Sequence, residues 1–215
     1  MRYTSFVLLL LVVGTLGANY DYYVLATQWA GTICKEQKCS STGSISTSFF
    51  NIHGLWPSQN SNALNPANCP SVSFTSSYFT STTSSTLKSY WSGLYSSTDS
   101  FHDHEWTKHG SCWNNDVKKT NPVDDYFNKV VTLAKKYNAY DILSKSNIKP
   151  GKSYSIDSIK NALSSSYKSG NFLVVCSSKN RIQEIRLCLD KNYNPRNCPT
   201  SGSQGCSGNV EFPSL

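Results

Sequence analysis

The amino-acid sequence predicts a single α+β domain stabilised by disulfide bonds. A chain of 215 residues is long enough for one sizeable domain. Segments rich in aromatic and β-branched residues indicate strands, while others have the apolar spacing of amphipathic helices. Neither an internal repeat nor a domain boundary divides the chain.

The N-terminal residues 1–17 form a separate unit. Arg2 is followed by an apolar run of about 10 residues that ends in small residues near Gly17 and Ala18, which is typical of a secretory signal peptide. The alternative is a buried N-terminal helix. The run is too short to span a membrane, and no later segment comes close. We therefore expect a mature domain over 18–215 that enters an oxidising compartment.

The first half of the mature chain contains two expected strands, at 20–30 and 44–56, followed by a loop from Pro57 to Pro70. Residues 71–100 are more than half Ser and Thr, a bias that fits either a linker or a folded segment with a polar exterior. Leu87, Trp91 and other apolar residues recur there at helical spacing, which favours the folded segment.

The second half of the chain begins with a short helix expected at 102–110, closed by Gly110. A clearer helix is expected at 121–137, where Asn121 can cap and Pro122 suits the first turn. Another amphipathic helix is expected at 155–167, and the segments 171–178 and 182–189 indicate a β-hairpin. The tail after Asn192 is expected to be loop.

The chain has an even number of cysteines, all beyond the signal segment, so structural disulfides are expected. They are Cys34, Cys39, Cys69, Cys112, Cys176, Cys188, Cys198 and Cys206. No Cys-x-x-Cys pair is present, which argues against zinc ribbons and thioredoxin chemistry. Eight cysteines allow 105 pairings, and the sequence alone selects none of them.

The formal net charge is +7, or +6 after Arg2 leaves with the signal segment. A modest positive balance suits a polyanionic partner such as nucleic acid, but solubility alone would also explain it. No Asn-x-Ser/Thr sequon is present, so N-glycosylation is not expected.

All four histidines lie in two short stretches, NIHGLWP (51–57) and HDHEWTKHGSC (102–112). One explanation is a zinc site, because helical zinc proteases carry His-Glu-x-x-His. Here the spacing from His104 to His109 is one residue too long, so the two imidazoles would diverge by about 140° on a helix. Lys108 would also place a positive charge beside any cation. A zinc hydrolase is therefore disfavoured.

The same helical geometry favours acid–base chemistry. Glu105 and His109 would share one face, with Lys108 and His104 beside them, within an arc of about 140°. A solvated, charged helix face would explain the lysine and glutamate but not the concentration of histidine.

His53 adds a second imidazole from the first stretch. A lone histidine at the end of an apolar strand is most often a satisfied core residue. Two histidines on either side of a phosphodiester, however, can cleave RNA through its own 2′-hydroxyl. One imidazole removes the proton of that hydroxyl and the other protonates the departing 5′-oxygen. Lys108 and His104 could stabilise the developing phosphorane charge, and no metal is required.

These two stretches, in this order and at this separation, resemble the active-site segments of the ribonuclease T2 family of secreted acid ribonucleases. The resemblance also covers ATQWAGTIC (26–34) and the late cysteines, and so spans nearly the whole mature chain. The two motifs together, behind a signal peptide, are highly specific. The fold implied is a central antiparallel sheet flanked by helices.

The resemblance also implies roles for individual residues. His109 would be the general base and His53 the general acid, with a 2′,3′-cyclic phosphate formed first and then opened by water. Glu105 and Lys108 would stabilise the transition state, and His104 would hold the phosphate.

For substrate binding, the resemblance implies that Trp56 stacks on the base 5′ of the cut. It makes Gln28 and Phe101 candidates for the downstream base site. The disulfides implied are Cys34–Cys39, Cys69–Cys112, Cys176–Cys206 and Cys188–Cys198, of which Cys69–Cys112 would clamp the catalytic helix.

Two positions depart from what the resemblance implies. Some members of the family carry Asp two residues after the first-motif tryptophan, where it helps to select adenine. Here that position is Ser58, so low base specificity is expected. His102 matches no known role, and we expect it at the surface.

The sequence thus predicts a monomeric endoribonuclease that cleaves single-stranded RNA but not DNA, needs no metal or cofactor, and has no membrane span. It would be secreted or reach the lumen of a lysosome or vacuole. A non-catalytic binding or storage protein on the same scaffold remains an alternative, as does a ribonuclease that acts in self-recognition.

Overall fold

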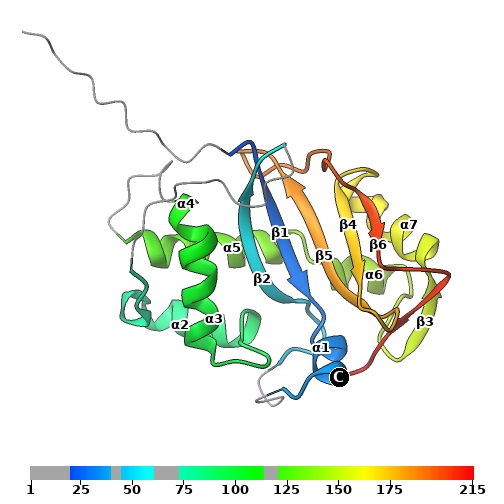
Figure 1. Cartoon of the computed structure of the whole chain (residues 1–215), viewed down its shortest axis with the longest axis horizontal. Coiled ribbons are helices and arrows are strands. Elements are labelled where there is room, and N and C mark those ends of the chain that lie inside the picture. Colours follow the sequence, from blue (N-terminus) through cyan, green and yellow to red (C-terminus); the bar gives the residue numbers. More distant parts are fainter. Residues whose placement is uncertain (1–19, 40–44, 61–72, 114–120) are drawn as a thin grey trace, which may run out of the picture.

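The computed structural model describes residues 20–39, 45–60, 73–113 and 121–215 of the chain (Figure 1). The predicted signal segment at 1–17 and most of the loop at 57–70 lie outside these residues. None of the described helices is long and apolar enough to cross a membrane.

A five-stranded sheet forms the centre of the molecule, in the order β2-β1-β5-β4-β6 (Figure 1). β1 pairs antiparallel with β2 and β5, and β5 pairs antiparallel with β4. Only the short β6 joins in parallel. The strands are β1 (Tyr22–Gln28), β2 (Asn51–Ser58), β4 (Phe172–Cys176), β5 (Ile182–Leu189) and β6 (Gly202–Gln204).

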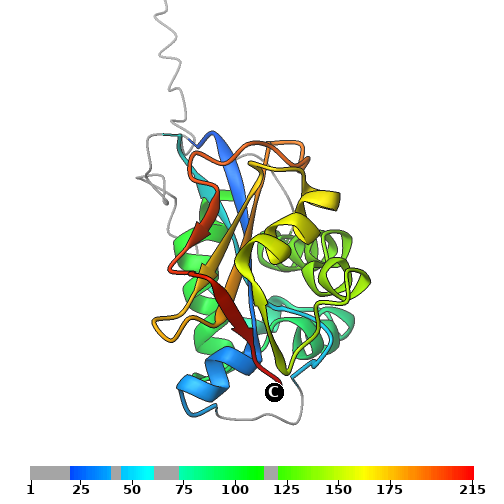
Figure 2. The same cartoon turned by 90° about the vertical axis from the view of Figure 1, so that its right-hand side faces the viewer.

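Three helices cover one face of this sheet (Figure 2). They are α5 (Pro122–Lys136), α6 (Ala139–Lys145) and α7 (Ile156–Tyr167). Alternate strand residues such as Leu25, Leu55 and Ile185 belong to the same buried cluster as Phe127 of α5. The mixed fold with a mainly antiparallel central sheet confirms the predicted fold class.

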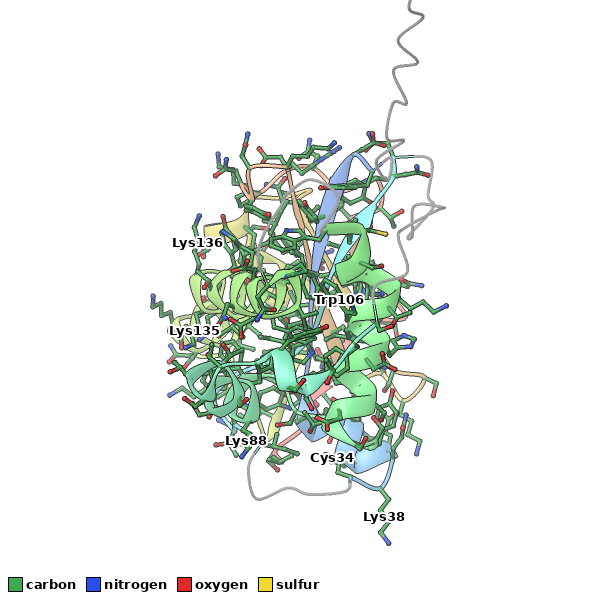
Figure 3. All side chains as sticks on the ribbon, turned by 90° about the vertical axis from the view of Figure 1, so that its left-hand side faces the viewer. Cys34, Lys38, Lys88, Trp106, Lys135 and Lys136 are labelled. Carbon is green, nitrogen blue, oxygen red and sulfur yellow. A yellow bond between two sulfur atoms is a disulfide. The ribbon has the colours of Figure 1, made fainter. Side chains whose placement is uncertain are left out.

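The remaining helices lie around the edges of the sheet. α1 (Ala30–Glu36) follows β1, and α2 (Ser81–Tyr90) follows a 3₁₀ turn, η1 (Ser76–Tyr78). α3 (Thr98–Glu105) continues through a π-helical turn, η2 (Trp106–Gly110), into α4 (Ser111–Trp113). Figure 1 shows this composite helix beside β2. Trp106, labelled in Figure 3, lies between it and α5, where its ring contacts Tyr126.

The elements with strong local signals are confirmed. α5 begins after Asn121, whose side chain accepts the Asp124 N–H, and Pro122 occupies the first turn. α7 and the β4–β5 hairpin also lie where the sequence predicts them. The Ser/Thr-rich segment is folded: α2 presents Leu87 to the core, and Trp91 is fully buried at its end.

Several element boundaries differ from the predictions. The second strand begins at Asn51 rather than at residue 44, and the helix expected at 102–110 begins at Thr98. The tail after Asn192 is not all loop: it contains β6 and also β7 (Asn209–Phe212), which pairs with β3 (Lys152–Ser155). Gly110 does not end its helix, which continues into α4. Glycine is needed there for close packing, because a Cβ would meet the rings of Trp106 and Tyr126.

His102 is buried, with 2% of its surface exposed, so its predicted surface position was wrong. Its Nε2–H donates to the Trp91 carbonyl at 2.8 Å, and its ring packs against Phe127 and Phe79. Burial lowers the pKa of His102 to about 4. The residue is therefore a neutral part of the core.

Three of the four implied disulfides are present in the structure: Cys34–Cys39, Cys176–Cys206 and Cys188–Cys198. The fourth implied pairing, Cys69–Cys112, includes Cys69, which lies outside the described residues.

Candidate active site

The first imidazole of the site comes from an irregularity in β2. Ala26 and Thr27 of β1 pair with Gly54 and Ile52 of β2, so His53 has no partner position and forms a β-bulge. Ile52 and Leu55 both contact the core although they are three residues apart, which a regular strand would not allow. The extra residue lets the strand keep both core contacts while His53 remains partly exposed on the opposite side.

The second group of residues comes from the composite helix. Glu105 ends α3 and His109 lies in the π turn, where the Ser111 N–H bonds to the Trp106 carbonyl five residues earlier. Glu105 and His109 are buried, with 1% and 8% of their surfaces exposed, whereas His104 and Lys108 are exposed. Of these four predicted residues, the helix therefore buries Glu105 and His109 and leaves His104 and Lys108 at its surface.

The Glu105 carboxyl group lies between the imidazoles of His53 and His109. Its Oε1 is 3.7 Å from His53 Nε2, and its Oε2 is 3.9 Å from His109 Nε2. The Trp56 indole N–H donates to Oε2 at 3.0 Å. Gly54 makes this arrangement possible, because a Cβ at that position would overlap the Glu105 carboxylate and the Trp56 indole nitrogen.

The two imidazoles have pKa values displaced in opposite directions. Burial lowers the pKa of His109 to about 3, assisted by the charges of His104, His53 and Lys108. Burial also opposes charge on His53, but the hydrogen bond and charge of Glu184, with Glu105, raise its pKa above 6.5 overall. Near pH 6, His53 is therefore protonated and His109 is neutral.

The pKa of Glu105 is also displaced. Burial raises it to about 7, although His53 and the Trp56 N–H favour the ionised form. Among the residues that the structure describes, Glu105 Oε1 has no hydrogen-bond partner. In mildly acidic solution this carboxyl group therefore keeps its proton and can donate it to a ligand oxygen.

The candidate base-binding residues lie around this centre. Trp56 contacts His53, with ring centroids 5.0 Å apart, and Phe101 contacts His53 from α3 at 5.7 Å. Gln28 is buried and stands opposite Glu184 in the β1–β5 pairing. The sheet and the composite helix thus bring all of the predicted residues into one region, with His104 and Lys108 at its exposed side.

Trp56 is largely covered in this structure, with 7% of its surface exposed. The Arg186 guanidinium lies over its ring at 5.3 Å, and the His109 ring is 5.3 Å away. Ser58 is fully buried, and its hydroxyl donates to the Trp56 carbonyl. The serine hydroxyl is therefore engaged within the strand.

Sequence reasoning missed Glu184 and Arg186 of β5. Glu184 Oε1 lies 2.6 Å from His53 Nδ1, and its Oε2 accepts from Arg186. One signal was present: two charged residues two apart in a mostly apolar hairpin strand share a face. Nothing local indicated that this face contacts His53.

No group of three or more His, Cys, Asp or Glu side chains within the described ranges is arranged to hold a metal ion. Of the pair considered for zinc, His104 is exposed and His109 is buried.

Comparisons of the sequence and of the fold with known proteins point to one family. The family model of the ribonuclease T2 family matches residues 20–198. Ribonuclease 1 of Arabidopsis thaliana is 30% identical over 208 residues, covering 92% of this chain and 88% of that protein. The solved structure of an RNase-related protein from Calystegia sepium superposes with a TM-score of 0.77 at 27% identity, covering 91% of this chain and 98% of that one.

Two relatives from Solanum lycopersicum differ in the location that their names give. Extracellular ribonuclease LE is 28% identical and covers 99% of this chain and 97% of its own length. Intracellular ribonuclease LX is 29% identical and covers 96% and 89%. Relatives of similar identity are thus named as extracellular in one case and as intracellular in the other.

Proposed function

Because the chain belongs to the ribonuclease T2 family of endoribonucleases, we propose that it cleaves single-stranded RNA by attack of a 2′-hydroxyl on the adjacent phosphate. The products would be a 2′,3′-cyclic phosphate and then a 3′-phosphate end, formed without a metal or other cofactor. The observation that carries this proposal is a buried carboxyl group flanked by two imidazoles whose pKa values are displaced in opposite directions.

The displaced pKa values support a division of roles between the histidines. Neutral His109 removes the proton from the 2′-oxygen as the bond from that oxygen to phosphorus forms. Protonated His53 donates its proton to the 5′-oxygen as the bond between phosphorus and that oxygen breaks. In the second step a water molecule attacks the cyclic phosphate: His53, now neutral, removes the water proton, and His109 returns its proton to the 2′-oxygen.

Glu105 would stabilise the pentacoordinate phosphorane. Its raised pKa supports a protonated carboxyl group that would donate to a phosphoryl oxygen, and its buried Oε1 has no hydrogen-bond partner among the described residues. Lys108 and His104 are exposed on the same helix. Lys108 would help Glu105 to stabilise the phosphorane, and His104 would hold the phosphate.

Base recognition would be weak. Phe101 is partly exposed, and Trp56 would stack on a base only after the Arg186 guanidinium moves off its ring. Stacking does not distinguish bases strongly because every base has a π-face. Gln28 would contribute to the downstream site. Ser58 supports low specificity, since its hydroxyl is engaged by the Trp56 carbonyl instead of facing a base.

The proposed cellular setting is secretion, or transport to the lumen of a lysosome or vacuole, with a mature monomer over 18–215. This proposed location requires cleavage of the signal segment at 1–17 in the secretory pathway. Mass spectrometry of the mature N-terminus tests this, and an N-terminus that retains Met1 would contradict it.

The decisive experiment is cleavage of a single-stranded RNA in excess EDTA. The wild type should cleave it, and the double variant His53→Ala, His109→Ala should lose at least about a thousandfold in rate. His102→Gln serves as a matched histidine control and should keep its activity. Full activity in the double variant would exclude the proposal, and an inactive wild type would favour a non-catalytic binding protein.

Product analysis separates this chemistry from other nucleases. The new ends should carry a cyclic phosphate or a 3′-phosphate, and single-stranded DNA should remain intact because it lacks the 2′-hydroxyl. Products with a 5′-phosphate would contradict the mechanism. Digestion of the four homopolymers at comparable rates would support low base specificity.

A further inference from the structure

Both carboxylate oxygens of Glu184 form hydrogen bonds next to the candidate active site. Glu184 is buried in β5, with 4% of its surface exposed. Its Oε1 lies 2.6 Å from His53 Nδ1. Its Oε2 accepts from Arg186 Nε at 2.7 Å and forms an ion pair with Arg186 Nη2 at 2.7 Å. Since the hydrogen bonds to His53 and Arg186 outweigh burial and lower the pKa of Glu184, the carboxylate is ionised and can only accept hydrogen bonds. The hydrogen between it and His53 therefore belongs to Nδ1.

We propose that Glu184, held in place by Arg186, is the positioning residue of His53: it keeps the hydrogen on Nδ1 and directs Nε2 toward the reacting phosphate. The inference rests on the proposed role of His53 as the acid of the first step.

The tautomer matters because His53 must use the same nitrogen in both steps. After the first step the imidazole is neutral and could carry its hydrogen on either nitrogen. The Nδ1–H bond to Glu184 leaves the lone pair on Nε2, the nitrogen that lies 3.7 Å from Glu105. Nε2 is then ready to remove the water proton in the second step, as in catalytic groups where a carboxylate orients a histidine.

The charged groups around His53 come from three elements. Glu184 and Arg186 face it from β5, Glu105 from α3, and the titratable His109 from the π turn. Burial and Arg186 oppose the imidazolium, whereas Glu184 favours it, as does Glu105 when ionised, and the pKa of His53 is raised overall. Among the described residues, Glu184 is the only one of these groups that forms a hydrogen bond with the His53 ring.

The structure also explains how Arg186 can hold Glu184 rigidly. β1 lies between β2 and β5, and its residue opposite both Arg186 and Gly54 is Ala26. This small side chain leaves room for the guanidinium to cross β1 and lie over the Trp56 ring. Trp56 in turn donates to Glu105, so Arg186 is supported on both of its sides.

The test is the pH profile of kcat/KM for RNA cleavage by Glu184→Gln. This variant keeps an oxygen acceptor for Nδ1 but loses the charge, so the pKa of His53 should fall. The alkaline limb should move to lower pH by about one unit, with about a tenfold loss at pH 7 that is recovered in acid. Arg186→Gln should move the same limb to higher pH, because it removes the cation that opposes His53 protonation.

Glu211→Gln is the matched control. It removes a carboxylate that also pairs with an arginine, Arg181, but lies on β7 away from His53. Its profile should coincide with that of the wild type. An unshifted alkaline limb in Glu184→Gln would overturn the inference.

Nitrogen-15 NMR of the wild type provides a measurement that does not depend on a variant folding. Neutral His53 should show a protonated Nδ1 and an unprotonated Nε2, and the opposite tautomer would overturn the inference. His53→Ala distinguishes the two proposals: if it cleaves RNA normally, the proposed function fails. If His53→Ala is inactive while the Glu184 and NMR results are negative, only the role of Glu184 fails.

Discussion

At the scale of single residues, the two imidazoles of the site define a window of pH. The proposed base, His109, must be neutral, and its pKa is about 3. The proposed acid, His53, must be protonated, and its pKa lies above 6.5. We therefore expect kcat/KM to rise through about pH 3 and to fall above pH 6.5, where Glu105 also loses its proton with a pKa of about 7. An activity that increases steadily from pH 6 to pH 8 would contradict these assignments.

The buried His102 should make the protein less stable in acid. Its pKa is about 4 in the folded protein, against 6.5 when unfolded. The unfolded state therefore binds the proton first, and stability is lost as the pH falls from 6.5 toward 4. This residue alone should contribute about 3 kcal/mol to that loss.

Urea unfolding at pH 7 and pH 4 measures this effect. His102→Gln keeps a donor for the Trp91 carbonyl but does not titrate, so the difference between the two pH values should shrink by about 3 kcal/mol. The contribution of His109 is present in both proteins and cancels. An equal pH dependence in wild type and variant would show that His102 is not responsible.

At the scale of elements, the fit between β2 and the composite helix depends on Gly54. In Gly54→Ala the new Cβ would displace the Glu105 carboxylate and the Trp56 indole. We expect a loss of about 10²-fold in kcat, because such shifts misplace catalytic groups by about an ångström. Steady-state cleavage of a short RNA measures it.

Gly208→Ala is a suitable control for that variant. Gly208 has φ of +52° with open space around its Cα, so alanine there should cost about 1 kcal/mol of stability through backbone strain. Cleavage should be unchanged. If Gly54→Ala behaves like Gly208→Ala, the contact with Glu105 is not important for catalysis.

The predictability of the elements follows from how local their signals are. α5 is specified by Asn121, Pro122 and an apolar stripe within its own residues, so the sequence predicts it closely. β7 is specified by pairing with β3, which lies far earlier in the chain, and its own four residues carry no distinctive pattern. The π turn likewise could not be predicted, because placing residues at about 100° each assumes a regular α-helix.

The site shows the same division. His53, Glu105 and His109 could be found because rare residue types cluster in two recognisable stretches. Glu184 could not, since its significance arises only when β1 places β5 at the correct distance from β2. His102 was misjudged for the same reason: its sequence neighbours are polar, while its spatial neighbours are Phe79, Trp91 and Phe127.

At the scale of the whole molecule, the C-terminal strand closes the core. Phe212 is fully buried and packs against Trp29 and Phe50, and the Trp29 indole N–H donates to the Pro213 carbonyl at 2.7 Å. Phe212→Ala should lower the free energy of unfolding by about 3–5 kcal/mol.

Thermal or urea unfolding of the variant tests this, with Leu215→Ala as the control. Leu215 lies three residues further along and is exposed, so its truncation should change stability by less than about 0.5 kcal/mol. Equal effects of the two variants would show that the end of the chain is not part of the core.

The bulge at His53 has a consequence for how such an enzyme can arise. The strand contains one residue more than its partner requires, and the helix that carries His109 widens in the same way at its π turn. Ile52, Leu55 and Trp106, which lie at or beside these irregularities, belong to the buried core. The proposed catalytic residues His53 and His109 thus stand at irregular positions of the backbone, so substituting them can alter the chemistry while the neighbouring core contacts are kept.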